Sequence, residues 1–131
     1  MKDLPVPENE FRERLKKLQS KLSENGDQGA IVFYEYLERE GNVSYLTNNR
    51  SSFPNVMSHK GIGYGAFVLS TEGEGLLVAP FGYEEERVVN VSGGIIEPDL
   101  VGGLLKAVEE LKLNGKNIGI AGTDILPYEY F

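Results

Sequence analysis

The sequence has 131 residues, of which 40% are hydrophobic and 25% charged, and its formal net charge at pH 7 is -7. That composition is typical of one folded domain, and the negative charge disfavours nucleic acid and anionic membranes as partners. Cysteine is absent, which excludes disulfides, thiolate nucleophiles and thiolate metal ligands. The polar first residues do not resemble a secretory signal, and no apolar stretch approaches the roughly 20 residues of a membrane span. We therefore expect a cytoplasmic protein.

The first predicted element is a helix from about residue 8 to residue 25. Its apolar side chains recur at helical spacing, at Phe11, Leu15, Leu18 and Leu22. Oppositely charged side chains follow one another at i,i+4 in three pairs, Glu8 with Arg12, Glu10 with Arg14 and Glu13 with Lys17. The apolar stripe requires a partner surface, which we expect to be a sheet.

Short apolar runs predict the strands of that sheet. Residues 29–33 form a nearly continuous run, as expected for a strand covered on both faces. Residues 65–69 and 76–79 are two further strands, and the glycine-rich turn between them predicts an antiparallel hairpin. Phe67 is expected in the core. Tyr45, next to Leu46, is also expected to pack.

The second half of the chain alternates between helix and strand. Residues 83–90 are predicted as a short helix, and Ile95 with Ile96 as a short strand. Asp99 is expected to cap a helix that ends near residues 114–115, and residues 118–121 are predicted as the last buried strand. This order predicts an α/β fold in which helices flank a mixed sheet.

The chain contains no complete catalytic motif. His59 is the single histidine and has no serine, cysteine or carboxylate at motif spacing, so a surface or interface position is favoured. Three consecutive glutamates, at 84–86, cannot converge on one metal from a helix. The glycines of residues 61–65 precede a strand, where a phosphate-binding loop would precede a helix. No catalytic residue and no metal site is therefore predicted.

The longest irregular stretch, residues 48–61, holds the candidate site residues. Phe53 lies in a polar context, which suggests contact with something outside this chain. Arg50 could bind a carboxylate in bidentate fashion, and a plain surface position is its alternative. Segments of this length and composition are usually either functional or mobile.

Several segments together resemble the N-terminal domain of the creatinase/prolidase (Xaa-Pro peptidase, aminopeptidase P) superfamily. They are the opening helix from Phe11, the Gly-Ala-Ile-Val strand at 29–32, Asn-Val-Ser-Tyr-Leu-Thr at 42–47, Leu-Leu-Val-Ala-Pro at 76–80 and Asn-Ile-Gly-Ile at 117–120. The resemblance covers nearly the whole chain and rests on the order and spacing of short motifs. Where the superfamily usually has glycine after Tyr-Leu-Thr, this sequence has Asn48.

The resemblance implies an RNase-H-like mixed sheet over residues 1–122, with residues 123–131 beginning a connection to a C-terminal catalytic domain. In that family the catalytic domain holds two divalent metals, of the Mn, Co or Zn type, and this chain would hold none. The family's N-terminal domain helps to form a homodimer and places a loop over the partner's active site. The corresponding loop here carries Arg50, Phe53 and His59 as candidate substrate contacts.

Three functions follow from these observations. The first is a non-catalytic domain of a metal-dependent Xaa-Pro aminopeptidase or dipeptidase, which acts in dimerisation and substrate enclosure. The second is a non-enzymatic peptide-binding or scaffold module of the same superfamily. The third is a free-standing domain that binds a small ligand at the sheet edge.

Overall fold

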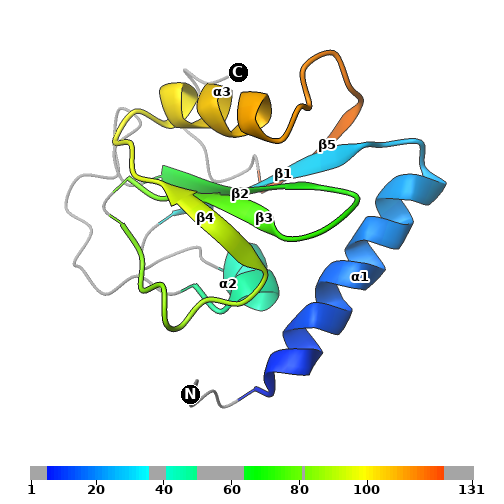
Figure 1. Cartoon of the computed structure of the whole chain (residues 1–131), viewed down its shortest axis with the longest axis horizontal. Helices are drawn as coiled ribbons and strands as arrows, with labels where there is room; N and C mark the ends of the chain where they lie inside the picture. The colour runs from blue at the N-terminus through cyan, green and yellow to red at the C-terminus, as the bar shows by residue number, and fades with distance from the viewer. Residues whose placement is uncertain (1–5, 36–40, 50–63, 81, 123–131) are drawn as a thin grey trace.

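The computed structural model describes residues 6–35, 41–49, 64–80 and 82–122 (Figure 1). The elements, in chain order, are α1 (Glu8–Glu24), β1 (Gly29–Glu35), α2 (Gly41–Thr47), β2 (Tyr64–Ser70), β3 (Gly75–Val78), β4 (Val91–Ile95), α3 (Leu100–Glu110) and β5 (Ile118–Ala121). Candidate residues Arg50, Phe53 and His59, and the connection at 123–131, lie outside the described residues.

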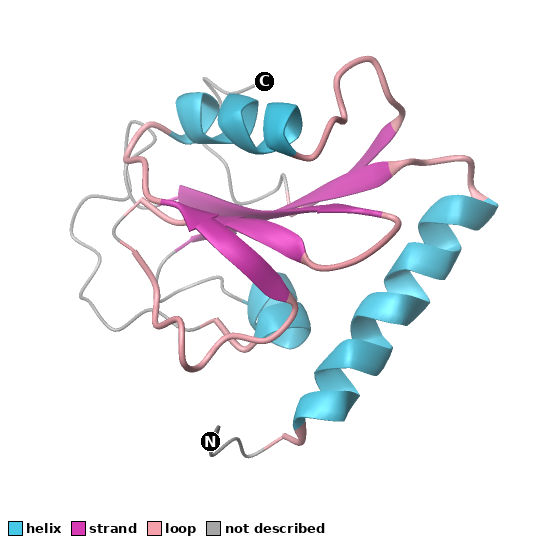
Figure 2. Ribbon diagram, in the orientation of Figure 1, coloured by secondary structure: helices cyan, strands magenta, loops and turns pink. Residues whose placement is uncertain are grey.

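The strands form one mixed sheet in the order β4-β3-β2-β1-β5. Neighbours β1 and β2, and β2 and β3, are antiparallel, whereas β5 runs parallel to β1 and β4 parallel to β3. Helices α1 and α2 lie on one face of the sheet and α3 on the other (Figures 1 and 2). The structure confirms the predicted α/β class, the helix-flanked mixed sheet and the β2–β3 hairpin.

Alternation along the central strands supplies both cores. On the face of α1 and α2, Val32 pairs in register with Phe67, which in turn pairs with Leu77, and all three side chains are buried in one cluster. The intervening residues point to α3, where Phe33 and Ala66 pair and join a second cluster. Both faces of β1 are covered, as the sequence predicted.

Both long helices start where the sequence predicted, and α1 also ends within one residue of its predicted end. Helix α3 ends at Glu110, before the predicted stop at residues 114–115, because Lys112 takes a left-handed φ of 58° that a helix does not accommodate. Asp99 caps α3, because its side chain accepts a hydrogen bond of 3.2 Å from the backbone N–H of Gly102. The helix lies close to the sheet at Gly103, where an added Cβ would come within 2.5 Å of Val78 Cγ1. Helix α1 ends one residue before Asn25 and carries the predicted Glu8–Arg12 and Glu10–Arg14 ion pairs, at 3.0 and 3.5 Å. Glu13 and Lys17 do not pair.

Residues 83–90 are not helical, contrary to the prediction. They form a turn in which the Arg87 N–H donates to the Glu84 carbonyl at 3.0 Å, and the chain then enters β4. Asn90 has a φ of 67°, which no helix accommodates, and the valines before it are buried against the sheet. The strand predicted at Ile95 and Ile96 therefore begins earlier, at Val91, and leaves Ile96 exposed.

Strand β5 exists as predicted, but it is not buried. It lies at the edge of the described sheet, paired only with β1 among the described strands, and 61% of Ile120 is exposed. A continuous apolar run of four residues cannot by itself distinguish a central strand from an edge strand.

Candidate functional site

The segment that carries Arg50, Phe53 and His59 follows residues 47–49, which we call its stem. Helix α2 ends at Thr47, and Asn48 and Asn49 follow it, both buried, with 4% and 2% of their surface exposed. On the far side of the segment, the first residue of β2, Tyr64, is also buried. The structure thus shows where the candidate segment leaves and re-enters the fold.

Asn48 ends α2 in the left-handed backbone conformation. Its φ is 61°, a region that glycine occupies freely and asparagine tolerates better than most residues. The Asn48 N–H donates to the Ser44 carbonyl at 2.8 Å, and its Nδ2 donates to the Arg87 carbonyl at 3.2 Å. Asparagine therefore preserves the turn that glycine would make here and adds a hydrogen bond to the 82–90 connection.

Thr47 completes the stem on both sides. Its Oγ1 donates to the Val43 carbonyl at 2.6 Å and accepts from the Asn49 N–H at 3.1 Å, while its carbonyl accepts from the Val89 N–H at 2.8 Å. The stem is consequently fixed to the 82–90 connection of the same chain. Asn49 Nδ2 remains as a buried donor without a partner among the described residues.

Asn90 joins the stem to α1 and to the sheet. Its Nδ2 donates to the backbone carbonyls of Phe11 and Leu46, at 2.9 and 2.8 Å. The backbone carbonyl of Asn90 accepts from the Gly75 N–H at 2.9 Å. Asn90 as a whole is 2% exposed, so these bonds are shielded from water. Sequence reasoning did not identify Asn90, because its partners lie 79 and 44 positions away along the chain.

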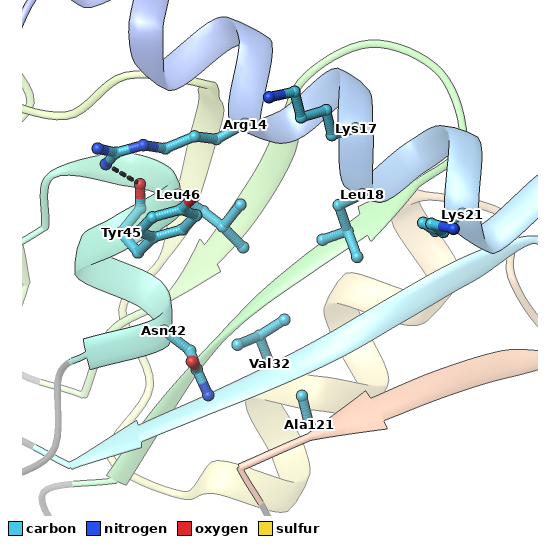
Figure 3. A pocket seen from close by; sticks show the side chains of 9 residues that line it. All are labelled: Arg14, Lys17, Leu18, Lys21, Val32, Asn42, Tyr45, Leu46 and Ala121. Atoms are coloured by element: carbon cyan, nitrogen blue, oxygen red, sulfur yellow. Dashed lines mark hydrogen bonds between the residues drawn. The ribbon is translucent and has the colours of Figure 1, made fainter.

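A groove of about 350 Å³ opens between α1 and α2 on the same face (Figure 3). Val32 of β1 and Ala121 of β5 form its floor, and Leu18 and Leu46 contribute apolar walls. The remaining lining residues are Arg14, Lys17, Lys21, Asn42 and Tyr45. Among the described residues, the groove therefore combines an apolar interior with a rim of three cations and has no carboxylate in its lining.

Arg14 closes one end of the groove and is already bonded. Its guanidinium lies 4.0 Å from the centre of the Tyr45 ring and 5.0 Å from that of Phe11, and Nη1 donates to the Tyr45 carbonyl at 2.9 Å (Figure 3). Its buried Nε lies 3.5 Å from Glu10 Oε1 without forming a hydrogen bond. Tyr45 packs on this arginine with 55% of its surface exposed, rather than in the core.

The other two cations of the rim are less constrained. Lys21 lies 3.6 Å from Glu24 in an exposed pair, and Lys17, one turn earlier, makes no ion pair with any described residue. Exposed pairs of this kind contribute little to stability. Lys17 and Lys21 together leave positive charge beside the apolar floor of an otherwise acidic protein.

The described residues do not fit a metal site. No three histidine or acidic side chains among residues 6–35, 41–49, 64–80 and 82–122 gather closely enough to hold an ion. Glu84 instead lies 3.7 Å from Arg87 in an exposed ion pair. Within the same ranges, no helix combines the length and apolar character needed to cross a bilayer.

Comparison with known families adds to this geometry. The profile described as Creatinase/Prolidase N-terminal domain matches residues 14–131. The chain belongs to the creatinase/prolidase N-terminal domain family. The match covers the groove, the stem at Thr47–Asn49 and the five described strands of this creatinase/prolidase N-terminal domain. No curated protein matches the chain.

Proposed function

We propose that this creatinase/prolidase N-terminal domain is the non-catalytic part of a metal-dependent Xaa-Pro peptidase, an aminopeptidase or dipeptidase. In this role it contributes to a homodimer and helps to enclose the peptide substrate. Two divalent metals of the Mn, Co or Zn type would be bound by another domain of the protein, since the described residues offer no ligand cluster. Their chemistry, when bound, is the activation of water for amide hydrolysis.

The buried stem at residues 47–49 is the observation on which this proposal rests. Side-chain hydrogen bonds from Thr47 and Asn48, together with those of Asn90, fix the point from which the segment of Arg50, Phe53 and His59 departs. A segment that contacts a substrate gains precision when its base is rigid. An arginine suits the carboxylate of a short peptide, and an aromatic side chain suits its apolar part.

Peptide hydrolysis tests the proposal. We expect the isolated chain to show no hydrolysis of a Xaa-Pro dipeptide with Mn²⁺, and the protein that contains it to be active. In that protein, Arg50→Ala and Phe53→Ala should raise KM, while Ser52→Ala in the same segment serves as the matched control. Hydrolysis by the isolated chain, or unchanged kinetics in both variants, would contradict the proposal.

The groove supports a second candidate function, a peptide-binding module without catalysis. Its apolar floor and Lys17, which forms no ion pair with a described residue, are complementary to an extended peptide that alternates acidic and apolar residues. Titration with a synthetic peptide of alternating aspartate and leucine should shift the methyl resonances of Leu18, Val32 and Ala121. The same peptide with lysine in place of aspartate is the charge control.

Two substitutions on one helix sharpen that titration. Lys17→Glu should weaken binding of the acidic peptide, whereas Lys16→Glu, which changes the same charge outside the groove lining, should not. Equal weakening by both variants would indicate a general charge effect and would remove the support for a specific groove.

A further inference from the structure

Two asparagines of this chain precede a glycine, Asn25 and Asn114, and every other asparagine precedes a residue with a side chain. Both are exposed and both follow a helix. Their glycines share the left-handed conformation, with φ of 79° at Gly26 and 73° at Gly115, and no atom lies within 4 Å of either absent Cβ. The two sites are therefore matched in sequence, in exposure and in the φ of their glycines.

The hydrogen bond of the glycine N–H distinguishes the two sites. At the end of α1, the Gly26 N–H donates to the Ser23 carbonyl at 3.1 Å. In the connection from α3 to β5, the Gly115 N–H donates to no acceptor among the described residues. That turn is closed one residue later, where the Lys116 N–H donates to the Leu113 carbonyl at 3.1 Å. The Gly115 nitrogen is thus free to react.

We propose that Asn114 is a site of spontaneous deamidation and that the end of α1 protects Asn25. The Gly115 nitrogen loses its proton and attacks Cγ of Asn114, a new C–N bond forms, and Nδ2 leaves as ammonia. The resulting cyclic imide takes up water and opens at either carbonyl, which gives aspartate or isoaspartate. The reaction consumes only water and requires no oxidant, reductant or cofactor.

The product changes the connection between α3 and β5. Each conversion adds one negative charge. The isoaspartate form also lengthens the backbone between Leu113, which is buried, and Asn117, which is exposed. The Asn117 carbonyl accepts from the Gln28 N–H at 2.7 Å, so this connection also fixes the start of β1. The proposal concerns a chemical modification site and is independent of the proposed function.

Peptide mapping tests the proposal within one sample. The purified chain is incubated in mildly alkaline buffer, and aliquots are digested with a protease that cleaves after glutamate. Cleavage after Glu24 and after Glu110 places Asn25 and Asn114 in separate peptides, and mass spectrometry follows the conversion of amide to acid in each. Fragmentation separates Asn114 from Asn117. A parallel incubation in urea gives both rates without the fold.

We expect Asn114 to convert at least about fivefold faster than Asn25 in the folded chain, which is the factor that an N–H···O bond of about 1 kcal/mol amounts to. In urea the two rates should become similar, and Asn114→Gln should abolish the signal in its own peptide alone. Equal rates in the folded chain, or faster conversion of Asn25, would overturn the proposal.

Discussion

The two faces of the sheet are stabilised in different ways. The α3 face is packed by apolar side chains that come mainly from β1, β2, β3 and α3. The face of α1 and α2 has an apolar core of similar extent, but it also buries the polar side chains of Thr47, Asn48, Asn49 and Asn90. Buried amides cost free energy unless they are bonded, and most of these bonds converge on the stem of the candidate segment. The comparison indicates that one face is held by apolar packing, whereas the other also fixes, by buried hydrogen bonds, the base of the segment that we propose contacts the substrate.

Removing a large apolar side chain should destabilise the protein on either face. Phe67 and Leu100 are 0% and 1% exposed, on the α1/α2 face and the α3 face. We expect Phe67→Ala to lower the free energy of unfolding by about 3–5 kcal/mol and Leu100→Ala by about 2–5 kcal/mol. Urea unfolding of both variants measures these losses. A loss below about 1 kcal/mol in either variant would contradict the packing of that face.

Asn90 should make the α1/α2 face sensitive to a polar substitution. Asn90→Gly keeps the positive φ but removes the Nδ2 donor from the carbonyls of Phe11 and Leu46. The Phe11 carbonyl keeps its bond within α1, whereas the Leu46 carbonyl is left without a donor among the described residues. We expect a loss of about 2–4 kcal/mol in the free energy of unfolding, from one unsatisfied buried acceptor and one further lost hydrogen bond. Asn90→Ala should cost more, because alanine adds backbone strain at this φ. An Asn90→Gly variant as stable as the wild type would show that the Asn90 side-chain amide does not stabilise the fold.

Asn48 separates backbone conformation from hydrogen bonding at the stem. Asn48→Gly retains the left-handed turn and loses one partly buried bond to the Arg87 carbonyl, so we expect a change within about 1 kcal/mol. Asn48→Ala should cost about 1–2 kcal/mol more than glycine, because of the penalty for a Cβ at positive φ. Thermal unfolding of the pair measures the difference. Equal stability of the two variants would be inconsistent with a left-handed residue at this position.

The smallest effect is expected on the α3 face, at an exposed ion pair. Hydrogen bonds from Lys106 and from the Asp99 N–H lower the pKa of Glu97 below its ordinary value. A lowered folded pKa means that the stabilisation is present at neutral pH and is lost as the pH falls through the folded pKa. Lys106→Met should raise the pKa of Glu97, which an NMR titration of its side chain would detect, and should reduce the loss of stability in acid. An unchanged titration would show that the pair does not form in solution.

The sequence predicted the elements that depend on local patterns. The helical spacing from Phe11 to Leu22 predicted α1, the turn chemistry at residues 70–75 predicted the hairpin, and Asp99 predicted the start of α3. It failed at residues 83–90, where three glutamates favour a helix start but two buried valines and the conformation of Asn90 require a turn. The conformation of Asn90 depends on its hydrogen bonds to the carbonyls of Phe11 in α1 and Leu46 in α2, and no local sequence pattern reveals these distant partners.

The candidate site was predictable only in part. The position of the candidate segment followed from family resemblance, and Arg50, Phe53 and His59 remain predictions. The stem that holds it was not predicted, since Thr47, Asn48 and Asn90 are polar residues in ordinary sequence contexts whose burial arises from tertiary packing. The cationic groove was likewise missed, because the helical spacing of Lys17 and Lys21 indicates only a solvent-exposed face.

Hydrogen exchange at the stem tests most directly whether buried amides hold it in place. The amide protons of Asn49 and Val89, which donate to Thr47, should exchange as slowly in the wild-type chain as those of the central strands. In Asn90→Gly, the exchange rates of these two amides should rise by a much larger factor over their wild-type values than the exchange rates of the β2 amides. Uniform acceleration throughout the sheet, or rapid exchange of both amides in the wild-type chain, would contradict a rigid stem.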